Sequence, residues 1–207
     1  NPAYVPGLSI SPMNKLNRLI VITALSFGLL ASAQGAVEVF NIDPVHSSAG
    51  FTLRHLMSRF TGSFTKVTGS ISVDREHLEN STVTATVDVA SVNTANEKRN
   101  GHLLGGDFFN VTQFPSMTFK SSSWKKTGED TYDVTGDLTI KDVTKPVTLK
   151  VTVLGFGPGM KPGSTVSGWE ATTTIKKSEF NLAGPAMLGK VLGDEVNVTI
   201  SVEANHS

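Results

Sequence analysis

The sequence predicts an all-β fold in which eight or nine short antiparallel strands form a sandwich or a barrel. Three observations lead to this prediction. After residue 36, apolar and polar residues alternate with a period of two, which places them on opposite faces of a strand. Segments rich in glycine, proline, asparagine and aspartate separate the alternating runs, as turns do. No long run has the spacing of an amphipathic helix.

Each predicted strand is recognised by the residues that share one of its faces. Residues 74–80 and 125–130 separate strands as turns, and residues 155–163 form a Gly/Pro-rich loop. In chain order, the alternating residues are Val37, Val39 and Asn41; Ala49, Phe51 and Leu53; Phe60, Gly62 and Phe64; Gly69, Ile71 and Val73; Val83, Ala85, Val87 and Val89; Met117 and Phe119, in a strand ending near Trp124; Tyr132, Val134, Gly136, Leu138 and Ile140; Val147, Leu149, Val151 and Val153; and the runs 168–176 and 196–203.

The other face of most strands carries Thr, Ser, Asp, Lys or Asn, which favours one apolar interior and one wetted exterior. If the strands close into a barrel of about eight, its interior is just wide enough for side chains or one slender ligand. An outer-membrane barrel is the alternative, but it turns apolar residues outward and carries aromatic girdles. With 11 Phe, two Tyr and two Trp, this chain has few residues for such girdles.

The N-terminal residues predict export. Residues 13–18 form a short basic segment, residues 19–30 an apolar one, and Ala31-Ser32-Ala33 a small-residue cleavage site. We therefore expect a signal peptide over 13–33, a mature domain over 34–207 and a periplasmic location, with cleavage after Ala36 as the second choice. The apolar run is shorter than the roughly 20 residues that span a bilayer, so stable membrane insertion is not expected. Residues 1–12 read as translated sequence upstream of the true start.

Composition excludes several classes of function. The chain has no cysteine, which removes disulfides, thiolate metal ligands and nucleophilic thiols. Once Lys15 and Arg18 leave with the signal peptide, 16 basic residues stand against 18 acidic ones, a formal charge of −2. This balance gives no electrostatic signature of binding to nucleic acid or to an anionic membrane surface.

Residues 96–109 break the β pattern and are expected to include a short helix. A basic cluster beside an apolar one suits a ligand with a polar head and an oily tail, although a plain capping helix on a barrel has the same composition. The segment contains Lys98, Arg99 and His102, and beside them Leu103, Leu104, Phe108 and Phe109.

A series of motifs resembles the YceI-like family, the polyisoprenoid-binding, lipocalin-like proteins of the bacterial periplasm. The resemblance covers essentially all of residues 38–204, and its strength lies in the order of many short motifs. They are Ile42-Asp43-Pro44-Val45-His46-Ser47, Phe51-Thr52-Leu53-Arg54-His55-Leu56, Gly62-Ser63-Phe64, Gly69-Ser70-Ile71, Asp88-Val89-Ala90-Ser91-Val92-Asn93-Thr94, Arg99-Asn100-Gly101-His102-Leu103, Asp107-Phe108-Phe109, Phe114-Pro115, Gly136-Asp137-Leu138-Thr139-Ile140, Val143-Thr144-Lys145-Pro146-Val147 and Gly193-Asp194-Glu195-Val196.

The resemblance implies an extended antiparallel eight-stranded lipocalin-like barrel with a helical segment over it. Its lumen is expected to hold an isoprenoid or a similar amphiphilic lipid, without catalysis and without another cofactor. The chain departs from the family at Arg99-Asn100, where an Arg-Asp pair is common, and at Lys177-Ser178, where the family has Arg-Ser. Both changes soften a charged contact.

Two sets of residues are candidates for the site. Phenylalanines are expected to line an apolar tunnel, which a prenyl chain enters through loss of apolar hydration; the same rings could simply fill the core. Basic residues are expected to bind the head group, since an Arg fork or a protonated His suits phosphate or carboxylate oxygens. The sets are Phe51, Phe64, Phe108, Phe109, Phe114 and Phe119 for the tunnel, and Arg99, His102, His46, His55 and Arg54 for the head group.

The basic residues also have structural interpretations. His46 can be a turn residue next to Pro44, His55 a half-buried residue at a strand end, and Arg99 one partner of a surface ion pair. The sequence has no His-Glu-x-x-His and no Gly-x-Ser-x-Gly, the motifs of zinc proteases and serine hydrolases. A homodimer through an exposed strand edge stays open.

Three functions therefore compete. The first is a periplasmic carrier or store for an isoprenoid-type lipid. The second is an enzyme or a metal- or haem-associated accessory protein, which requires two or more of His46, His55 and His102 to converge within coordinating distance. The third is a structural or stress-related barrel with a fully packed core and no cavity.

Overall fold

The computed structural model describes residue 3, residues 36–182 and residues 184–207. The segment 1–12, apart from residue 3, and the predicted signal peptide, residues 13–33, lie outside the described residues. Residues 36–207 belong to one compact unit.

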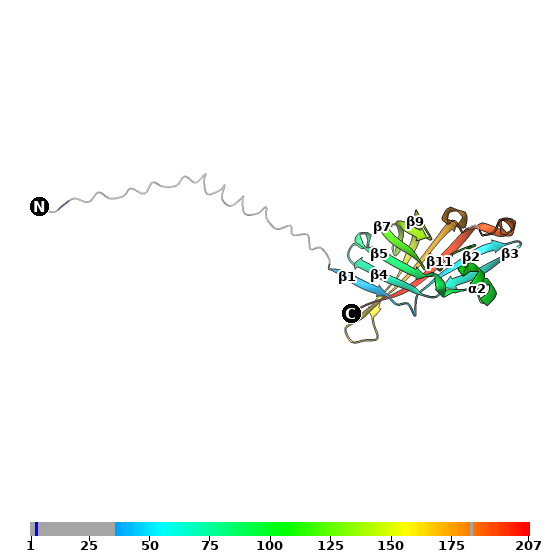
Figure 1. Ribbon diagram of the computed structural model, residues 1–207. Coiled ribbons are helices and arrows are strands. Elements are labelled where there is room, and N and C mark those ends of the chain that lie inside the picture. Colours follow the sequence, from blue (N-terminus) through cyan, green and yellow to red (C-terminus); the bar gives the residue numbers. More distant parts are fainter. Residues whose placement is uncertain (1–2, 4–35, 183) are drawn as a thin grey trace. The chain divides into compact units, whose positions relative to one another are not determined.

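The described chain contains eleven strands, one α-helix and four short 3₁₀ helices (Figure 1). The strands are β1 (Val37–Ile42), β2 (Ser48–His55), β3 (Ser58–Phe64), β4 (Val67–Asp74), β5 (Thr82–Asp88), β6 (Val92–Asn93), β7 (Ser116–Lys126), β8 (Thr131–Ile140), β9 (Val143–Pro158), β10 (Thr165–Lys176) and β11 (Leu192–His206). The helices are α2 (Glu97–Leu104), η1 (Leu78–Asn80), η2 (Val89–Ser91), η3 (Lys177–Phe180) and η4 (Ala186–Lys190).

The strands form one closed antiparallel barrel. Neighbours follow the order β1, β4, β5, β7, β8, β9, β10 and β11, and β1 also pairs with β11, which closes the ring. Beyond the end of β1, β2 pairs with β11; β3 then pairs with β2, and β6 with β3. Three of the eight barrel strands are therefore each interrupted and made of two shorter segments: β1 with β2, β3 with β4, and β5 with β6. The predicted eight-stranded antiparallel barrel with one short helix is confirmed.

The break between β1 and β2 falls at residues 43–47. Pro44 has no backbone N–H and cannot continue a ladder on both edges. The backbone N–H of Asp43 donates to the carbonyl oxygen of Glu203 over 2.8 Å, and its Oδ1 accepts from the Val45 N–H over 2.8 Å. The hydroxyl of Ser47 accepts from the Glu203 N–H over 3.2 Å. These bonds hold the bend against β11.

Helix α2 begins after Asn96, whose side-chain oxygen accepts a hydrogen bond from the Arg99 N–H over 2.9 Å and caps the first turn. It ends at Leu104 and so takes up only part of the segment 96–109, in which a short helix is predicted. After Gly105 the chain turns, because the N–H groups of Phe108 and Asn110 both donate to the Gly105 carbonyl. Leu103 and Leu104 pack against the buried core.

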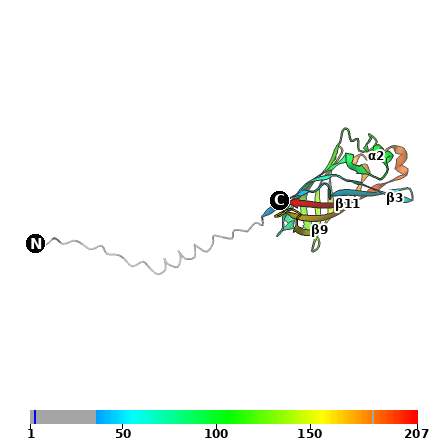
Figure 2. The same cartoon turned by 90° about the horizontal axis from the view of Figure 1, so that it is seen from below.

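The barrel has two different ends. Helix α2, the β2–β3 turn and η4 lie together at one end, here called the α2 end, and the C-terminus lies at the other (Figures 1 and 2). Strand β10 runs from the C-terminal end to the α2 end, because Thr165 pairs with His206 and Lys176 with Glu195.

Two details of the predicted strands are wrong. In β1 the inner face is taken by Phe40 and Ile42, which are buried, whereas Val37 and Val39 are 59% and 46% exposed. The aromatic ring takes the interior because it buries more apolar area than a valine.

The second correction concerns residues 155–158, which continue β9 instead of beginning a loop. Gly155 has a φ of 132°, and the register with β10 shifts between Gly168 and Trp169, so the pairing resumes after an irregularity. Phe156 then packs edge-on against Phe40 and Trp169. This aromatic contact keeps the glycine-rich segment in the sheet.

Candidate functional site

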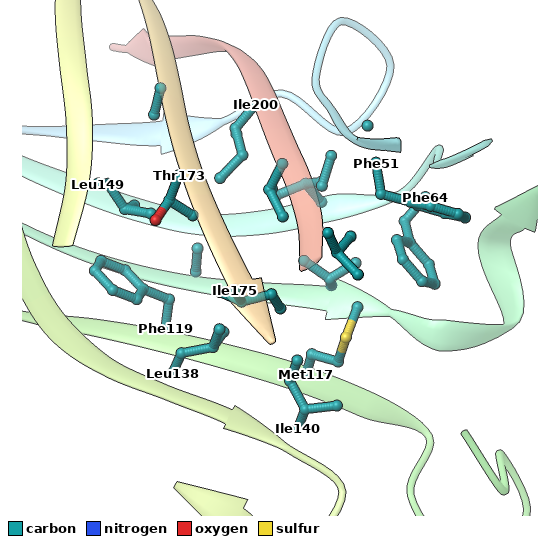
Figure 3. Close-up of a pocket in the computed structure, with 18 of the residues that line it drawn as sticks. Phe51, Phe64, Met117, Phe119, Leu138, Ile140, Leu149, Thr173, Ile175 and Ile200 are labelled. Carbon is teal, nitrogen blue, oxygen red and sulfur yellow. The ribbon is translucent and has the colours of Figure 1, made fainter. Parts of the chain in front are cut away.

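The barrel encloses an internal cavity of about 240 Å³. Side chains of the surrounding strands point into it, as Figure 3 shows. The residues labelled there are Phe51 on β2, Phe64 on β3, Met117 and Phe119 on β7, Leu138 and Ile140 on β8, Leu149 on β9, Thr173 and Ile175 on β10, and Ile200 on β11.

The lining of this cavity is apolar almost throughout. Among the described residues that form it, only Thr118, Thr173 and Lys177 carry a side chain with a polar end, apart from two indole rings. The hydroxyl of Thr173 donates to the Thr148 carbonyl over 3.0 Å, so that oxygen is already satisfied within the wall. Such a surface offers a guest burial of apolar area and few directional contacts.

Five of the six phenylalanines predicted for the tunnel line the cavity. Phe64 lies 5.6 Å from Phe51 and 5.5 Å from Phe109, measured between ring centroids. The contact with Phe109 links the barrel wall to the segment that follows α2. The lining phenylalanines are Phe51, Phe64, Phe108, Phe109 and Phe119, together with Phe60; Phe114, also considered for the tunnel, is not among them.

Two tryptophans form the floor of the cavity, toward the C-terminal end. Trp124 and Trp169 pack edge to face, with ring centroids 5.9 Å apart. The indole N–H of Trp169 donates to the Ser167 hydroxyl over 2.9 Å, and that of Trp124 to the Ser121 hydroxyl over 3.4 Å. Because both N–H groups are satisfied by buried serines, the indoles present apolar faces to the lumen.

Further aromatic packing closes the barrel behind this floor. Phe156 packs edge-on against Trp169 and against Phe40, with centroid distances of 5.6 Å and 5.7 Å. The Arg75 guanidinium lies 4.7 Å from the centroid of Phe156 and forms an ion pair with Glu38 over 2.6 Å. Neither Phe40 nor Phe156 lines the cavity, so the lumen ends at the tryptophans.

Arg99 lies at the α2 end but does not line the cavity. Its Nε donates to the Thr94 hydroxyl over 2.9 Å, and one terminal nitrogen donates to the Thr94 carbonyl over 2.6 Å. The guanidinium also lies 4.9 Å from the centroid of Phe60, a lining residue. No ion pair joins it to Glu97 or Asp107 among the described residues. These contacts give Arg99 a structural role in holding α2 to Thr94 at the α2 end. Its role in binding a head group stays a prediction.

The predicted histidines do not gather at one place. His102, exposed on α2, contacts Asp107 over 3.1 Å and packs edge-on against Phe108. His55 is exposed at the end of β2. His46 precedes β2 and His55 ends it. The seven steps from Ser48 to His55 span about 23 Å at roughly 3.3 Å per residue, so these two histidines cannot contact one ligand head. None of the three lines the cavity.

His46 forms a charged cluster outside the lumen. Its Nδ1 lies 3.0 Å from an oxygen of Asp43 and 3.7 Å from an oxygen of Glu203. The hydrogen bond with Asp43 raises the pKa of His46 above its usual 6.5, and it lowers the pKa of Asp43 below its usual 3.8. Within the described part of the chain, these three side chains are the one group whose ligand atoms are close enough to share a metal ion.

Sequence reasoning missed three parts of the cavity. The tryptophan floor could have been found from Ser167 and Ser121, since each stands two or three residues before a Trp and can accept its indole N–H. Lys177 had been noticed only as a departure from a family motif, yet it is buried and lines the cavity. Phe60 was placed on a strand face but not assigned to the site.

No helix in the part of the chain that the structure describes is both long and apolar enough to cross a membrane.

Comparison with known proteins identifies a family match over most of the barrel. Residues 40–204 match the model of the YceI-like domain. Protein YceI of Shigella flexneri is 38% identical over 182 residues, which cover 84% of this chain and 91% of that protein.

Solved structures of the same architecture are also similar. The YCEI protein of Campylobacter jejuni is 33% identical, with a TM-score of 0.66 over 74% of this chain and 90% of that one. A polyisoprenoid binding domain from Saccharophagus degradans, implicated in plant cell wall breakdown, has a TM-score of 0.62 over 83% of this chain and all of that one. At 18% identity, the second likeness concerns the fold alone.

Proposed function

Since this chain belongs to the YceI-like family, we propose that it binds an amphiphilic isoprenoid-type lipid and keeps its apolar tail in the barrel lumen. The protein then acts as a carrier or store, and the bound lipid leaves chemically unchanged. The polyisoprenoid binding domain from Saccharophagus degradans has a similar fold, and this supports the choice of ligand class.

The observation that carries the proposal is the cavity. A structural barrel with a fully packed core requires the phenylalanines to interdigitate, whereas here they surround about 240 Å³ of space. This volume lies just under the range of about 300–1,000 Å³ found for small-molecule pockets, so it suits a slender chain better than a broad ring system. Its apolar wall stabilises such a chain by about 25 cal/mol per Å² of apolar surface buried.

The orientation of the ligand follows from the two ends of the lumen. The tryptophan floor and the aromatic packing behind it close the C-terminal end. Lys177 follows directly after β10 and therefore lies at the α2 end, eight residues or about 26 Å of strand from Trp169. We place the tail against the tryptophans and the polar head near Lys177 and α2.

The accessory-protein alternative with a metal or haem gains less support. It needs two or more histidines within coordinating distance, but the one candidate metal group among the described residues contains His46 with two carboxylates. That group lies outside the cavity lining. A periplasmic location is part of the proposal, and it rests on the predicted signal peptide.

Native mass spectrometry of the protein recovered from a periplasm tests the proposal, with organic extraction of the same sample. We expect one species with the mass of a chain that begins at Gln34. A second, heavier species should exceed it by the mass of one prenyl lipid. Replacement of Val87, which lines the cavity, by Phe should lower uptake of an added prenyl alcohol about tenfold, because the ring fills the lumen. Ala85→Leu is a milder variant with the same direction of effect.

The matched control is Val39→Phe, which adds the same ring on the outer face of β1, where Val39 is 46% exposed. This variant should take up lipid as the unchanged protein does. A clean ligand-free mass, together with no uptake of added prenyl lipids, refutes the proposal and favours a barrel with another role.

A further inference from the structure

Three large apolar side chains are exposed at the α2 end. Met57 is 101% exposed, Met187 is 80% exposed and Leu56 is 52% exposed. Leu56 and Met57 form the β2–β3 turn, and Met187 belongs to η4. Exposed apolar residues that gather at one place mark interaction sites more often than scattered ones do.

The turn itself does not require these residues. His55 pairs with Ser58, so Leu56 and Met57 are the two residues of a tight hairpin connection. Leu56 has a φ of 50°, a conformation that is strained for leucine and that tight hairpins normally give to glycine or asparagine. Turn chemistry alone therefore predicts glycine here, and the sequence instead exposes leucine and methionine.

The exposed turn is joined to η4 and to the cavity wall. The Leu56 N–H donates to the Val191 carbonyl over 2.8 Å, which fixes the turn beside the end of η4. Next to this bond, His55 pairs with Leu192, a lining residue. Leu53 and Phe60, paired across the same hairpin, also line the cavity. The exposed apolar tip thus continues into the wall of the lumen.

The charges around the tip are positive. Residues 54–59 and 186–192 contain Arg54, Arg59 and Lys190 and no aspartate or glutamate, and these three side chains are exposed. The nearest acidic residues along the chain are Asp194, which accepts two hydrogen bonds from Ser178, and Glu195, whose register partner on the neighbouring strand is Lys176. The formal charge of the whole chain does not reveal this local excess of basic over acidic residues.

Apolar side chains surrounded by arginine and lysine are the composition of a surface that enters the headgroup region of an anionic bilayer. We infer that the tip formed by residues 54–59 and 186–192 docks on a membrane that contains anionic phospholipid, and that lipid enters or leaves the lumen there. The inference rests on the proposed function, because it assigns the place where that lipid is exchanged. Docking is peripheral: the apolar tip reaches the acyl boundary, and the barrel stays outside.

Vesicle flotation of the mature protein tests this inference, with vesicles of phosphatidylethanolamine and phosphatidylglycerol compared with vesicles of phosphatidylcholine alone. We expect binding to the first and little to the second, and weaker binding at high salt. The double variant Met57→Ser/Met187→Ser should lose most of the bound fraction. In Arg54→Ser and Arg59→Ser, binding should fall about fivefold for each arginine removed.

Met160→Ser is the matched control, since Met160 is 104% exposed but lies in the β9–β10 turn at the C-terminal end. It should float as the unchanged protein does. Equal flotation of the Met57→Ser/Met187→Ser variant and the unchanged protein overturns the inference. So does concentration-dependent self-association that this variant abolishes, because the tip then binds a second copy.

Lipid uptake separates this inference from the function on which it rests. Prenyl alcohol supplied in detergent micelles should enter the Met57→Ser/Met187→Ser variant as it enters the unchanged protein, because the lumen is intact. If the unchanged protein takes up no lipid from micelles, the proposed function fails; if it takes up lipid but does not bind vesicles, the docking site alone fails.

Discussion

At the scale of single residues, each polar side-chain atom that borders the apolar lumen needs a hydrogen-bond partner within the barrel wall. A buried donor without a partner destabilises a protein by about 1–3 kcal/mol, so each indole N–H at the floor must be satisfied before it can border an empty cavity. Ser167 and Ser121 do this, and no buried side-chain nitrogen or oxygen among the described residues lacks a hydrogen-bond partner. No buried polar atom of the described cavity wall therefore needs a guest to satisfy it.

The cluster of Asp43 and His46 gives a prediction about pH. The pKa of His46 is raised, so its contribution to stability is present below 6.5 and is lost as the pH rises through its folded pKa. The pKa of Asp43 is lowered, so its contribution is present above 3.8 and is lost as the pH falls through its folded pKa. The pair should stabilise the β1–β2 bend most between these two values.

Nuclear magnetic resonance titration of the His46 ring checks this directly. We expect a pKa above 6.5 in the unchanged protein and a lower one in Asp43→Asn, because the hydrogen bond with the carboxylate is its largest cause. The difference in melting temperature between the two proteins should shrink above the folded pKa of His46. An identical His46 titration in both proteins contradicts the account.

At the scale of elements, α2 depends on contacts with Thr94, the residue that follows β6. The Asn100 side-chain oxygen accepts from both the N–H and the hydroxyl of Thr94, over 2.9 Å and 2.6 Å. Arg99 adds two bonds to the same Thr94. Because an eight-residue helix is marginal on its own, these contacts and its apolar side chains hold it over the barrel end.

Arg99→Ala should therefore lower the free energy of unfolding by about 1–3 kcal/mol, since it removes hydrogen bonds from a charged donor. Arg99→Lys should recover little, because an ammonium cannot reproduce the planar fork. Urea denaturation measures both, and Lys98→Ala, an exposed neighbour on α2, is the control. Unchanged stability of Arg99→Ala combined with weaker lipid binding reverses the assignment and makes Arg99 a head-group residue.

The strands were largely predictable, because the period-two alternation of apolar and polar residues indicates which face of the sheet each side chain lies on. Phe51, Phe64 and Phe119 were placed on the inner face from this pattern alone, and all three line the cavity. The pattern failed where two faces are both apolar, as in β1, where the valines lie outside and Phe40 inside. It failed again at residues 155–158, because a long-range contact of Phe156 overrides the local preference of glycine and proline for loops.

The site was less predictable than the fold. Arg99, His102, His46 and His55 share a chemistry that suits a polar head group, but residue type does not say whether side chains meet. Strand β2 holds His46 and His55 near its opposite ends. Lys177 and the two tryptophans meet the lumen only because the barrel closes through β11. Closure is a property of the whole sheet and leaves no mark in any single segment.

At the scale of the whole molecule, the barrel is a tube with one sealed end. Aromatic residues close the C-terminal end, and α2, η4 and the β2–β3 turn surround the other (Figure 1). This asymmetry predicts how deep each part of the proposed lipid lies in the lumen. We expect the end of the tail to rest against Trp124 and Trp169, and the head to remain at the α2 end. The chain contains only these two tryptophans, so its indole fluorescence reports on the floor alone.

Quenching of this fluorescence by brominated prenyl lipids is the measurement that tests the central claim most directly. Bromine at the tail end should quench both tryptophans to saturation at one lipid per protein, and bromine beside the head group should quench weakly. Val87→Phe should suppress the effect and Val39→Phe should leave it intact. Equal quenching from both positions, or none from either, contradicts a lipid tail held in the lumen.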